Sequence, residues 1–381
     1  MFKYLPHTKE DIKEMLAKIG VTSLDDLFKD VPKSIVENSD YDLELAKSEH
    51  QLIKEMTQLA NKNKTLKVFR GAGSYDHHTP AIIPYLTSRG EFLTSYTPYQ
   101  PEVSQGTLQY IFEFQSYICE LTGMDVSNAS VYDGSTAAAE AMLMATSQTR
   151  RKKILISKTV NPQTIEVIKT YAHFRDIEVV EIASIDGETS KDFATEEAAG
   201  LIVEYPNYYG IIEDYHNFGE KIHNSGGLFI MIADPQSLAV LKSPRALGAD
   251  IVVGDGQSLG IPLQFGGPYV GFMAATKALT RRIPGRICGM TQDVDGKRGF
   301  VLTLQAREQH IRREKATSNI CSNQSLMALW VTIYLSIMGK DGMEKINEAC
   351  YNNATYLKEQ LLATNLFKVV YNKPFIKEFV L

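Results

Sequence analysis

Two polar motifs in this sequence suit a phosphorylated, nitrogen-containing ligand. Gly134-Ser135-Thr136 precedes an alanine-rich segment, and Asp234 ends an apolar run. The free amides at a helix start, together with two hydroxyls, can hold a phosphate. A buried carboxylate can hold a protonated ring nitrogen. Gly-Ser-Thr is also typical of an ordinary capped turn, so the interpretation depends on the elements that bring these residues together.

Apolar runs that favour strands alternate with amphipathic segments that favour helices through the middle of the chain. This alternation predicts a mostly parallel, doubly wound sheet with helices on both faces. The expected strands are 153–156, 178–182, 200–204, 228–233 and 251–254, and the expected helices include 137–147, 162–173 and 214–225. Ligands on such sheets bind beyond the carboxyl ends of the strands. Asp133, Asn207, Asp234 and Gln257 each follow a strand, so we expect them at one rim.

Enzymes that carry pyridoxal phosphate on such a sheet use a carboxylate at the end of one strand and a lysine after a later strand. The carboxylate pairs with the ring nitrogen, and the lysine forms an imine with the cofactor. The corresponding position here is Gln257, and an amide nitrogen is not a usable nucleophile for an imine. The chain is therefore either inactive, dependent on a partner, or an autonomous enzyme that uses another lysine, Lys277 or Lys242.

Two further segments have the composition of ligand-binding loops. The stretch 69–105 is rich in Tyr, Gln and His, and its candidate contacts are His77, Tyr96, Tyr99 and Gln100. Such side chains often line ligand sites, although an irregular crossover would have the same composition. The adjacent His77 and His78 point to different sides, and no third ligand has suitable spacing, so we expect no metal. Thr317, Ser318 and Asn319 precede an expected apolar helix at 325–338 and form a second candidate phosphate contact.

Composition excludes several classes of function. The chain has 381 residues, of which 44% are hydrophobic and 22% charged, with a net charge of −5. This balance gives no electrostatic footprint for nucleic acid or an anionic membrane. The four cysteines form no CxxC pair, which favours reduced thiols. No apolar run reaches the length of a membrane-spanning helix, and the first 20 residues do not resemble a secretory signal, so we expect a cytoplasmic protein.

Three regions are expected along the chain. Residues 1–68 form a helical N-terminal arm, residues 69–338 form the large doubly wound α/β domain, and residues 339–381 begin a small C-terminal α/β domain. The last region has one long helix and two short strand-like pieces, 367–371 and 375–381, which would bury little apolar surface. We therefore interpret the small domain as incomplete.

Several longer motifs are distinctive. They are Tyr4-Leu5-Pro6-His7-Thr8, Gly71-Ala72-Gly73-Ser74-Tyr75-Asp76-His77, Arg89-Gly90-Glu91-Phe92, the run from Ser95 to Gly106, Tyr132-Asp133-Gly134-Ser135-Thr136, and Ala316-Thr317-Ser318-Asn319-Ile320-Cys321. Together they resemble the glycine decarboxylase P-protein of the glycine cleavage system. The resemblance spans nearly the whole chain, and motifs of this length are specific. Within the family, the chain is most similar to the separate N-terminal-half subunit, subunit 1.

The resemblance implies the aspartate-aminotransferase-like fold, fold type I of the pyridoxal-phosphate-dependent transferases. It also implies that a lysine-bearing subunit 2 binds pyridoxal phosphate covalently and that this chain, with Gln257, does not. Together the subunits, in two copies each, would act as an oxidoreductase that decarboxylates glycine and passes the aminomethyl group to the lipoyl arm of the H-protein. This chain would be inactive alone.

Three roles for the chain remain open under this resemblance. In the first, the chain completes the partner's active site: Thr317, Ser318 and Asn319 reach the partner's cofactor phosphate, and His77, Tyr96, Tyr99 and Gln100 line the substrate entrance. Gly134, Ser135, Thr136 and Asp234 are then a vestigial pocket of its own. In the second, the chain is a non-catalytic scaffold for subunit 2. The third is the autonomous enzyme described above.

Overall fold

The computed structural model describes the chain except for residues 1–3, 5, 37–41, 70, 72 and 323. Leu5 and Ala72, which belong to two of the motifs above, lie outside the described residues. The chain divides into two compact units, Met1–Phe69 and Arg70–Leu381, and each is described by itself. The expected division at 338 within the second unit remains a prediction.

The first unit is helical, and its two longest described helices begin at residues that cap a helix. Its described helical segments are α1 (Lys9–Ile19), η1 (Asp25–Phe28), α2 (Lys33–Val36) and α3 (Glu49–Ala60). Thr8 and Asp11 form a capping box at the start of α1, and Ser48 and Gln51 form another at the start of α3. Each box satisfies amide groups that a helix start leaves without intrahelical partners.

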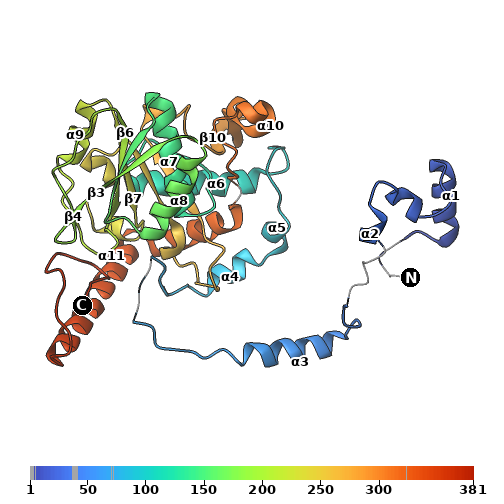
Figure 1. Cartoon of the computed structure of the whole chain (residues 1–381), viewed down its shortest axis with the longest axis horizontal. Helices are drawn as coiled ribbons and strands as arrows, with labels where there is room; N and C mark the ends of the chain where they lie inside the picture. Colours follow the sequence, from blue (N-terminus) through green and yellow to red (C-terminus); the bar gives the residue numbers. More distant parts are fainter. Residues whose placement is uncertain (1–3, 5, 37–41, 70, 72, 323) are drawn as a thin grey trace. The chain divides into compact units, whose positions relative to one another are not determined.

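The second unit is built on a seven-stranded sheet (Figure 1) with the order β1-β9-β8-β7-β6-β2-β3. Strands β8, β7, β6, β2 and β3 pair in parallel, whereas β9 pairs antiparallel with both β1 and β8. The strands are β1 (Val126–Ser127), β2 (Lys153–Ser157), β3 (Glu178–Ile182), β6 (Ala198–Tyr205), β7 (Leu228–Ala233), β8 (Ile251–Asp255) and β9 (Gly271–Ala275). The doubly wound parallel sheet expected from the sequence is confirmed.

Both faces of the sheet are buried, because alternate residues of each strand pack on opposite sides. In β6, Leu201 and Val203 belong to one core cluster and Ile202 to another. The first cluster includes residues of α6 (Gln105–Thr122), α9 (Phe218–Asn224) and α11 (Ser325–Ala363), and the second includes residues of α7 (Gly134–Thr149) and α8 (Pro162–His173). Figure 1 shows α7 and α8 together on one side of the sheet.

A hairpin and the chain end complete the second unit. The basic stretch 281–298 contributes to an antiparallel hairpin of β10 (Ile287–Gln292) and β11 (Arg298–Thr303). Its inward residues Cys288 and Phe300 are buried and share a core cluster with residues of α6. The chain end 367–381 forms no regular strand in the structure; it makes an isolated bridge between Phe375 and Ile211.

The remaining elements connect these layers. They are α4 (Ile82–Thr87), α5 (Gly90–Leu93), β4 (Ser184–Ile185), β5 (Glu188–Thr189), η2 (Ser237–Ala239), η3 (Pro244–Leu247), η4 (Gly256–Ser258), η5 (Lys277–Leu279), η6 (Gln305–Arg307), α10 (Gln309–Arg312) and η7 (Arg313–Lys315). The long α11 is interrupted at Gly339, whose φ of 56° is not helical.

Candidate functional site

A cavity of about 470 Å³ lies at the carboxyl ends of β6, β7 and β8. The residues that follow these strands line it, together with the starts of α7 and α8. The four residues expected at one rim, Asp133, Asn207, Asp234 and Gln257, all line this cavity. Further lining residues come from the loop before α4 and from the last residues of the chain; among them are Ser74, Tyr75, Ile376, Lys377 and Glu378.

The N-terminus of α7, the expected phosphate cradle, is occupied by the protein's own carboxylates. Asp133 caps the helix and accepts a hydrogen bond from Thr136 N at 2.8 Å. Asp255 Oδ2 accepts from Gly134 N at 2.9 Å. The Ser135 hydroxyl pairs with the Thr164 hydroxyl at 2.8 Å. A phosphate would therefore have to displace Asp255 from the Gly134 amide and would meet two carboxylates there.

Gln257 is buried and bonded on both sides of its amide. Its Oε1 accepts from Tyr75 N at 2.9 Å, and its Nε2 donates to Tyr75 O at 2.6 Å and to Ile261 O at 2.8 Å. The turn after β8 places the Gln257 side chain in this position. Strand β8 ends at Asp255, and the Asp255 side chain caps the short η4 turn by accepting a hydrogen bond from Gln257 N. Gln257 thus fixes the main chain of the loop around Tyr75 instead of offering a reactive nitrogen.

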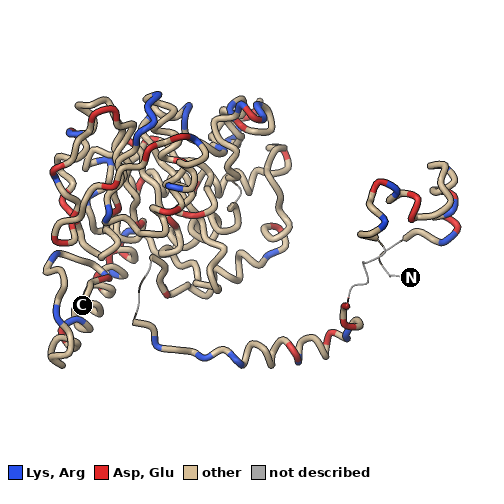
Figure 2. Tube along the Cα trace, viewed as in Figure 1, with Lys and Arg blue, Asp and Glu red and all other residues tan. Residues whose placement is uncertain are grey.

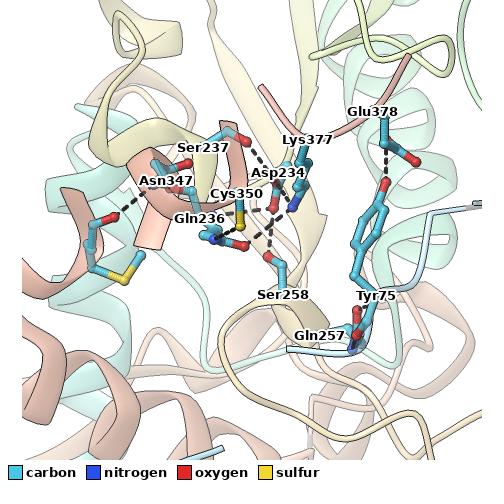
Figure 3. Close-up of polar contacts among 11 residues, drawn as sticks. Tyr75, Asp234, Gln236, Ser237, Gln257, Ser258, Asn347, Cys350, Lys377 and Glu378 are labelled. Atoms are coloured by element: carbon cyan, nitrogen blue, oxygen red, sulfur yellow. Dashed lines mark hydrogen bonds and ion pairs between the residues drawn. The ribbon is translucent and has the colours of Figure 1, made fainter. Parts of the chain in front are cut away.

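Asp234 is paired within the protein (Figure 3). Its carboxylate accepts from Lys377 Nζ at 2.6 Å, from the Ser258 hydroxyl at 2.6 Å and from the Ser237 hydroxyl at 2.5 Å. Burial alone would raise the pKa of Asp234, but the Lys377 ammonium and the two serine hydroxyls lower this pKa to about 2. Asp234 is therefore a carboxylate whose counter-ion is already present.

Sequence reasoning missed the chain end as part of this site. Lys377 and Glu378 enter the cavity from the segment after α11, and Glu378 accepts a hydrogen bond from the Tyr75 hydroxyl at 2.5 Å. Figure 3 shows the Tyr75 side chain pointing toward Glu378. The available signal is a Lys-Glu pair inside the otherwise apolar run from Phe375 to Leu381, because charged residues in such a run need partners.

The cavity is otherwise acidic. Burial, opposed in part by the hydrogen bond from Asn161 N, raises the pKa of Glu204 to about 8, with further raising contributions from nearby carboxylates. Burial also raises the pKa of Asp255 to about 7. Among the lining residues that the structure describes, Lys377 is the one lysine or arginine. Elsewhere in the second unit, acidic and basic residues are interspersed along the chain (Figure 2).

His77 lies beside this site. Its ring meets the Tyr75 ring edge-on, with centroids 5.9 Å apart. Burial and the Lys377 charge lower the pKa of His77 to about 4. Its Nε2 is buried without a hydrogen-bond partner among the described residues. The imidazole is therefore neutral near pH 7.

The other loop candidates do not line the cavity. Tyr96 is 82% exposed, and Gln100 is exposed. The Tyr99 hydroxyl accepts from Arg286 Nη2 at 3.4 Å, and its ring lies beside His310. The structure therefore separates these three residues from Gln257 and Asp234, and their predicted role at an entrance remains a prediction.

Thr317, Ser318 and Asn319 also lie outside the cavity lining. Thr317 N donates to Arg307 O at 3.4 Å. Ser318 Oγ accepts from Ile320 N at 3.0 Å, and the hydroxyl also contacts the carboxyl of Glu140 on α7. Thr317 and Asn319 are exposed. All three remain predicted contacts to a partner.

The two lysines considered for an autonomous enzyme are both exposed. Neither Lys277 nor Lys242 lines the cavity, so neither is placed to react with a ligand bound at Asp234. In the described part of the chain, no set of three or more His, Cys, Asp or Glu side chains is arranged to hold a metal ion. None of the described helices combines the length and hydropathy needed to cross a bilayer.

The residues at this site do not fit pyridoxal phosphate. An imine-forming lysine is replaced by Gln257, and the amide of Gln257 is engaged with Tyr75 and Ile261. The Gly134 amide is engaged by Asp255, and Asp234 is engaged by Lys377. All three anchoring points expected of such a pocket are therefore either lost or already paired within the chain.

Comparison with other proteins identifies the family. The chain matches the family described as glycine cleavage system P-protein over residues 2–380. It is 52% identical to a Bacillus cytotoxicus protein named "probable glycine dehydrogenase (decarboxylating) subunit 1", covering 100% of this chain and 86% of that protein. A Bacillus cereus protein of the same name has the same identity and coverage.

Solved structures agree with this relationship. The crystal structure of glycine decarboxylase (P-protein) of the glycine cleavage system, in inhibitor-bound form, matches with a TM-score of 0.92 and 45% identity, over 99% of this chain and 86% of that one. Aspartate aminotransferase from Thermus thermophilus shares the fold, with a TM-score of 0.53 and 15% identity over 78% of this chain and 77% of its own. The chain has the fold type I, aspartate-aminotransferase-like architecture and belongs to the glycine cleavage system P-protein family.

Proposed function

We propose that this chain is subunit 1 of a two-subunit glycine dehydrogenase (decarboxylating) and that it works only with a lysine-bearing subunit 2. The observation that carries this proposal is the cavity at Gln257, in which the positions that would anchor a cofactor are bonded within the chain. The names of the relatives, which specify a subunit 1, support a second subunit. Pyridoxal phosphate would then be bound covalently by the partner.

The proposed reaction follows from the family. The assembled complex would release the carboxylate of glycine as carbon dioxide and pass the aminomethyl group to the oxidised lipoyl arm of the H-protein. Pyridoxal phosphate held by the partner would supply the electron sink for the decarboxylation. The assembly would contain two copies of each subunit in the cytoplasm. With Asp234 paired to Lys377, this chain's own cavity takes no part in the chemical step.

This chain would contribute groups from its exposed loops. Thr317 and Asn319 are exposed, and Ser318 offers a hydroxyl, so the three are available to hydrogen-bond a phosphate on a partner. Tyr96 and Gln100 are exposed as well, and Tyr99 is held by Arg286 and His310. Such side chains can line the path of glycine or of the lipoyl arm.

The proposal is tested by assembly. The chain alone, incubated with pyridoxal phosphate and desalted, should retain no cofactor and show no exchange of glycine carboxylate with labelled bicarbonate. The mixture with subunit 2 and lipoylated H-protein should show this exchange. Exchange by the isolated chain, or full exchange by subunit 2 without it, would contradict the proposal.

Replacing Ser318 and Asn319 with alanine tests the phosphate contact. Loss of two hydrogen bonds to a charged group weakens binding by about ten-fold or more, so the assembled complex should lose pyridoxal phosphate more readily on dialysis. The double substitution Asn352→Ala/Asn353→Ala, at exposed positions of α11, serves as the matched control. Equal cofactor occupancy in the two double variants would refute the assignment.

The scaffold alternative predicts a different result at Tyr96 and Tyr99. If this chain only stabilises subunit 2, Tyr96→Ala and Tyr99→Ala complexes that assemble normally should decarboxylate glycine at the wild-type rate. We expect instead intact assembly by analytical ultracentrifugation with a reduced rate of exchange. A wild-type rate would favour the scaffold.

A further inference from the structure

We propose that Lys377 is a built-in cation of the cavity: it holds Asp234 where a cofactor's ring nitrogen would be expected, and it positions the loop 74–79 through the Tyr75 ring. Lys377 would thus be a positioning residue. The proposal concerns this chain alone and does not depend on the activity of the assembled complex.

The first support is the ion pair itself. Lys377 Nζ lies 2.6 Å from Asp234 Oδ2, and the side chains are only 11% and 19% exposed. A buried carboxylate left without its partner is strongly destabilising. Asp234 also accepts from Ser258 and Ser237, so the carboxylate is held on three sides. The pair needs no ligand to be satisfied.

The second support is the contact between Lys377 and Tyr75. Lys377 Nζ lies over the Tyr75 ring, 4.3 Å from its centroid, a distance suited to a cation–π interaction. The next residue, Glu378, accepts from the Tyr75 hydroxyl at 2.5 Å. The tyrosine ring is therefore fixed at its face and at its hydroxyl by two consecutive residues of the chain end.

The third support is the main chain of the loop. Gln257 bonds both the N–H and the C=O of Tyr75, and His77 N donates to Tyr75 O at 3.2 Å. Thr79 then donates its hydroxyl to Gly260 O at 2.7 Å. The loop is consequently anchored on the turn after β8 by hydrogen bonds and on the chain end by the Tyr75 ring.

The chain end is itself closely packed, which makes Lys377 a fixed cation. Gly210 has a φ of 80°, and a Cβ there would collide with the carbonyl of Glu378. Ile212 N donates to Pro374 O at 2.9 Å. The loop after β6 therefore holds the segment that carries Lys377. The chain end and the loop after β6 therefore meet near Asp234, and the loop that contains His77 packs against them.

Coupling between Asp234 and Lys377 is the first measurement. Asp234→Asn, Lys377→Met and the double variant of the full chain are compared with wild type by urea unfolding. Each single change leaves one buried charge alone, so each should lower the unfolding midpoint, and the double variant should lie closer to wild type than either. If the stability lost in the double variant equals the sum of the losses in the two single variants, the proposed coupling between Asp234 and Lys377 is wrong.

Loop position is the second measurement. Hydrogen exchange of the amides of residues 75 and 77 should be roughly ten-fold or more faster in Lys377→Met than in wild type, through easier local opening. Lys377→Arg, which keeps the cation, should restore most of the protection. Unchanged exchange in Lys377→Met would overturn the positioning role.

His77 supplies a spectroscopic readout of the Lys377 charge. The pKa of His77 is lowered to about 4 first by burial and second by Lys377. Followed by NMR and assigned with His77→Asn, this pKa should rise above about 4 in Lys377→Met, stay below its ordinary value of 6.5 because the ring is still buried, and remain low in Lys377→Arg. If Lys377→Met does not fold, Tyr75→Leu removes the ring contact and leaves the ion pair. Wild-type protection of residue 77 in Tyr75→Leu would contradict the inference.

Discussion

The side-chain amide of Gln257 makes three hydrogen bonds within the protein. Its oxygen accepts one bond and its nitrogen donates two, and the partners are the main chain of Tyr75 and Ile261. Glutamine suits this role because its amide can donate and accept at once. A lysine could donate to the carbonyls but could not accept from Tyr75 N.

Substituting Gln257 should therefore cost stability and gain no chemistry. Gln257→Leu removes three hydrogen bonds in a buried place: the Tyr75 amide and the Ile261 carbonyl lose the Gln257 partner, and the Tyr75 carbonyl keeps only its bond from His77 N. The free energy of unfolding should therefore fall by about 2–4 kcal/mol. Urea unfolding measures this loss. Ser135→Ala, which removes one hydroxyl bond to Thr164, is a milder comparison at the same cavity. A loss no larger than that of Ser135→Ala would contradict the role assigned to Gln257.

Gln257→Lys provides the complementary test. Restoring the amine leaves Asp255 on the Gly134 amide and Lys377 on Asp234, so this variant should retain no pyridoxal phosphate after desalting. Absorbance of the desalted protein checks this result. Stoichiometric retention would show that the missing lysine alone keeps the cofactor out.

At the scale of elements, α11 shows how one residue redirects a long helix. Gly339 interrupts it with a φ of 56° and a ψ of −170°, a conformation that residues with a Cβ rarely adopt. The break separates the buried first part, which packs against the sheet, from the part that leads toward Lys377. The change of direction of α11 at Gly339 therefore determines where the segment that carries Lys377 lies.

Gly339→Ala should lower the free energy of unfolding by about 1–2 kcal/mol, because alanine is strained at this φ. Gly106→Ala in α6 is the matched control: a Cβ there meets no atom within 4 Å, and no left-handed φ is required. That control should be neutral or more stable by about 0.5 kcal/mol. Equal effects of the two changes in urea unfolding would rule out the strain at Gly339.

At the scale of the whole molecule, buried carboxylates link folding to pH. The pKa of Glu204 is raised to about 8 from 4.5 and that of Asp255 to about 7 from 3.8, both chiefly by burial. The folded state therefore binds protons that the unfolded state has released. The stability due to these groups is fully present below their unfolded pKa values and is lost as pH rises through about 7 and 8.

The free energy of unfolding should accordingly decrease from pH 6 to pH 9, with Glu204 contributing about 2 kcal/mol of the decrease. Glu204→Gln imitates the neutral acid and should flatten this part of the profile. Urea unfolding at several pH values measures it. Parallel profiles for wild type and Glu204→Gln would show that Glu204 is already ionised at pH 6. The pKa of Asp234 is lowered to about 2, so its contribution to stability has the opposite pH dependence and is lost only as the solution becomes acidic.

Much of this architecture was predictable from local pattern. The alternation of apolar strands with amphipathic helices predicted the parallel sheet, and the rim position of Asp133, Asn207, Asp234 and Gln257 followed from their places after strands. Tyr96, Tyr99 and Gln100 were grouped with His77 by composition, yet only His77 lies beside the cavity.

The sequence by itself determined the family, the alternation of strands and helices along the chain and the absence of a lysine at position 257, since these depend on motifs and on local periodicity. Only the tertiary structure decided what occupies the positions around Asp234. Lys377, Glu378 and Asp255 reach their partners through the path of the chain, and contacts between distant segments leave no local periodicity to read. For that reason the sequence shows a lysine missing from the cavity, whereas the structure shows another lysine placed within it.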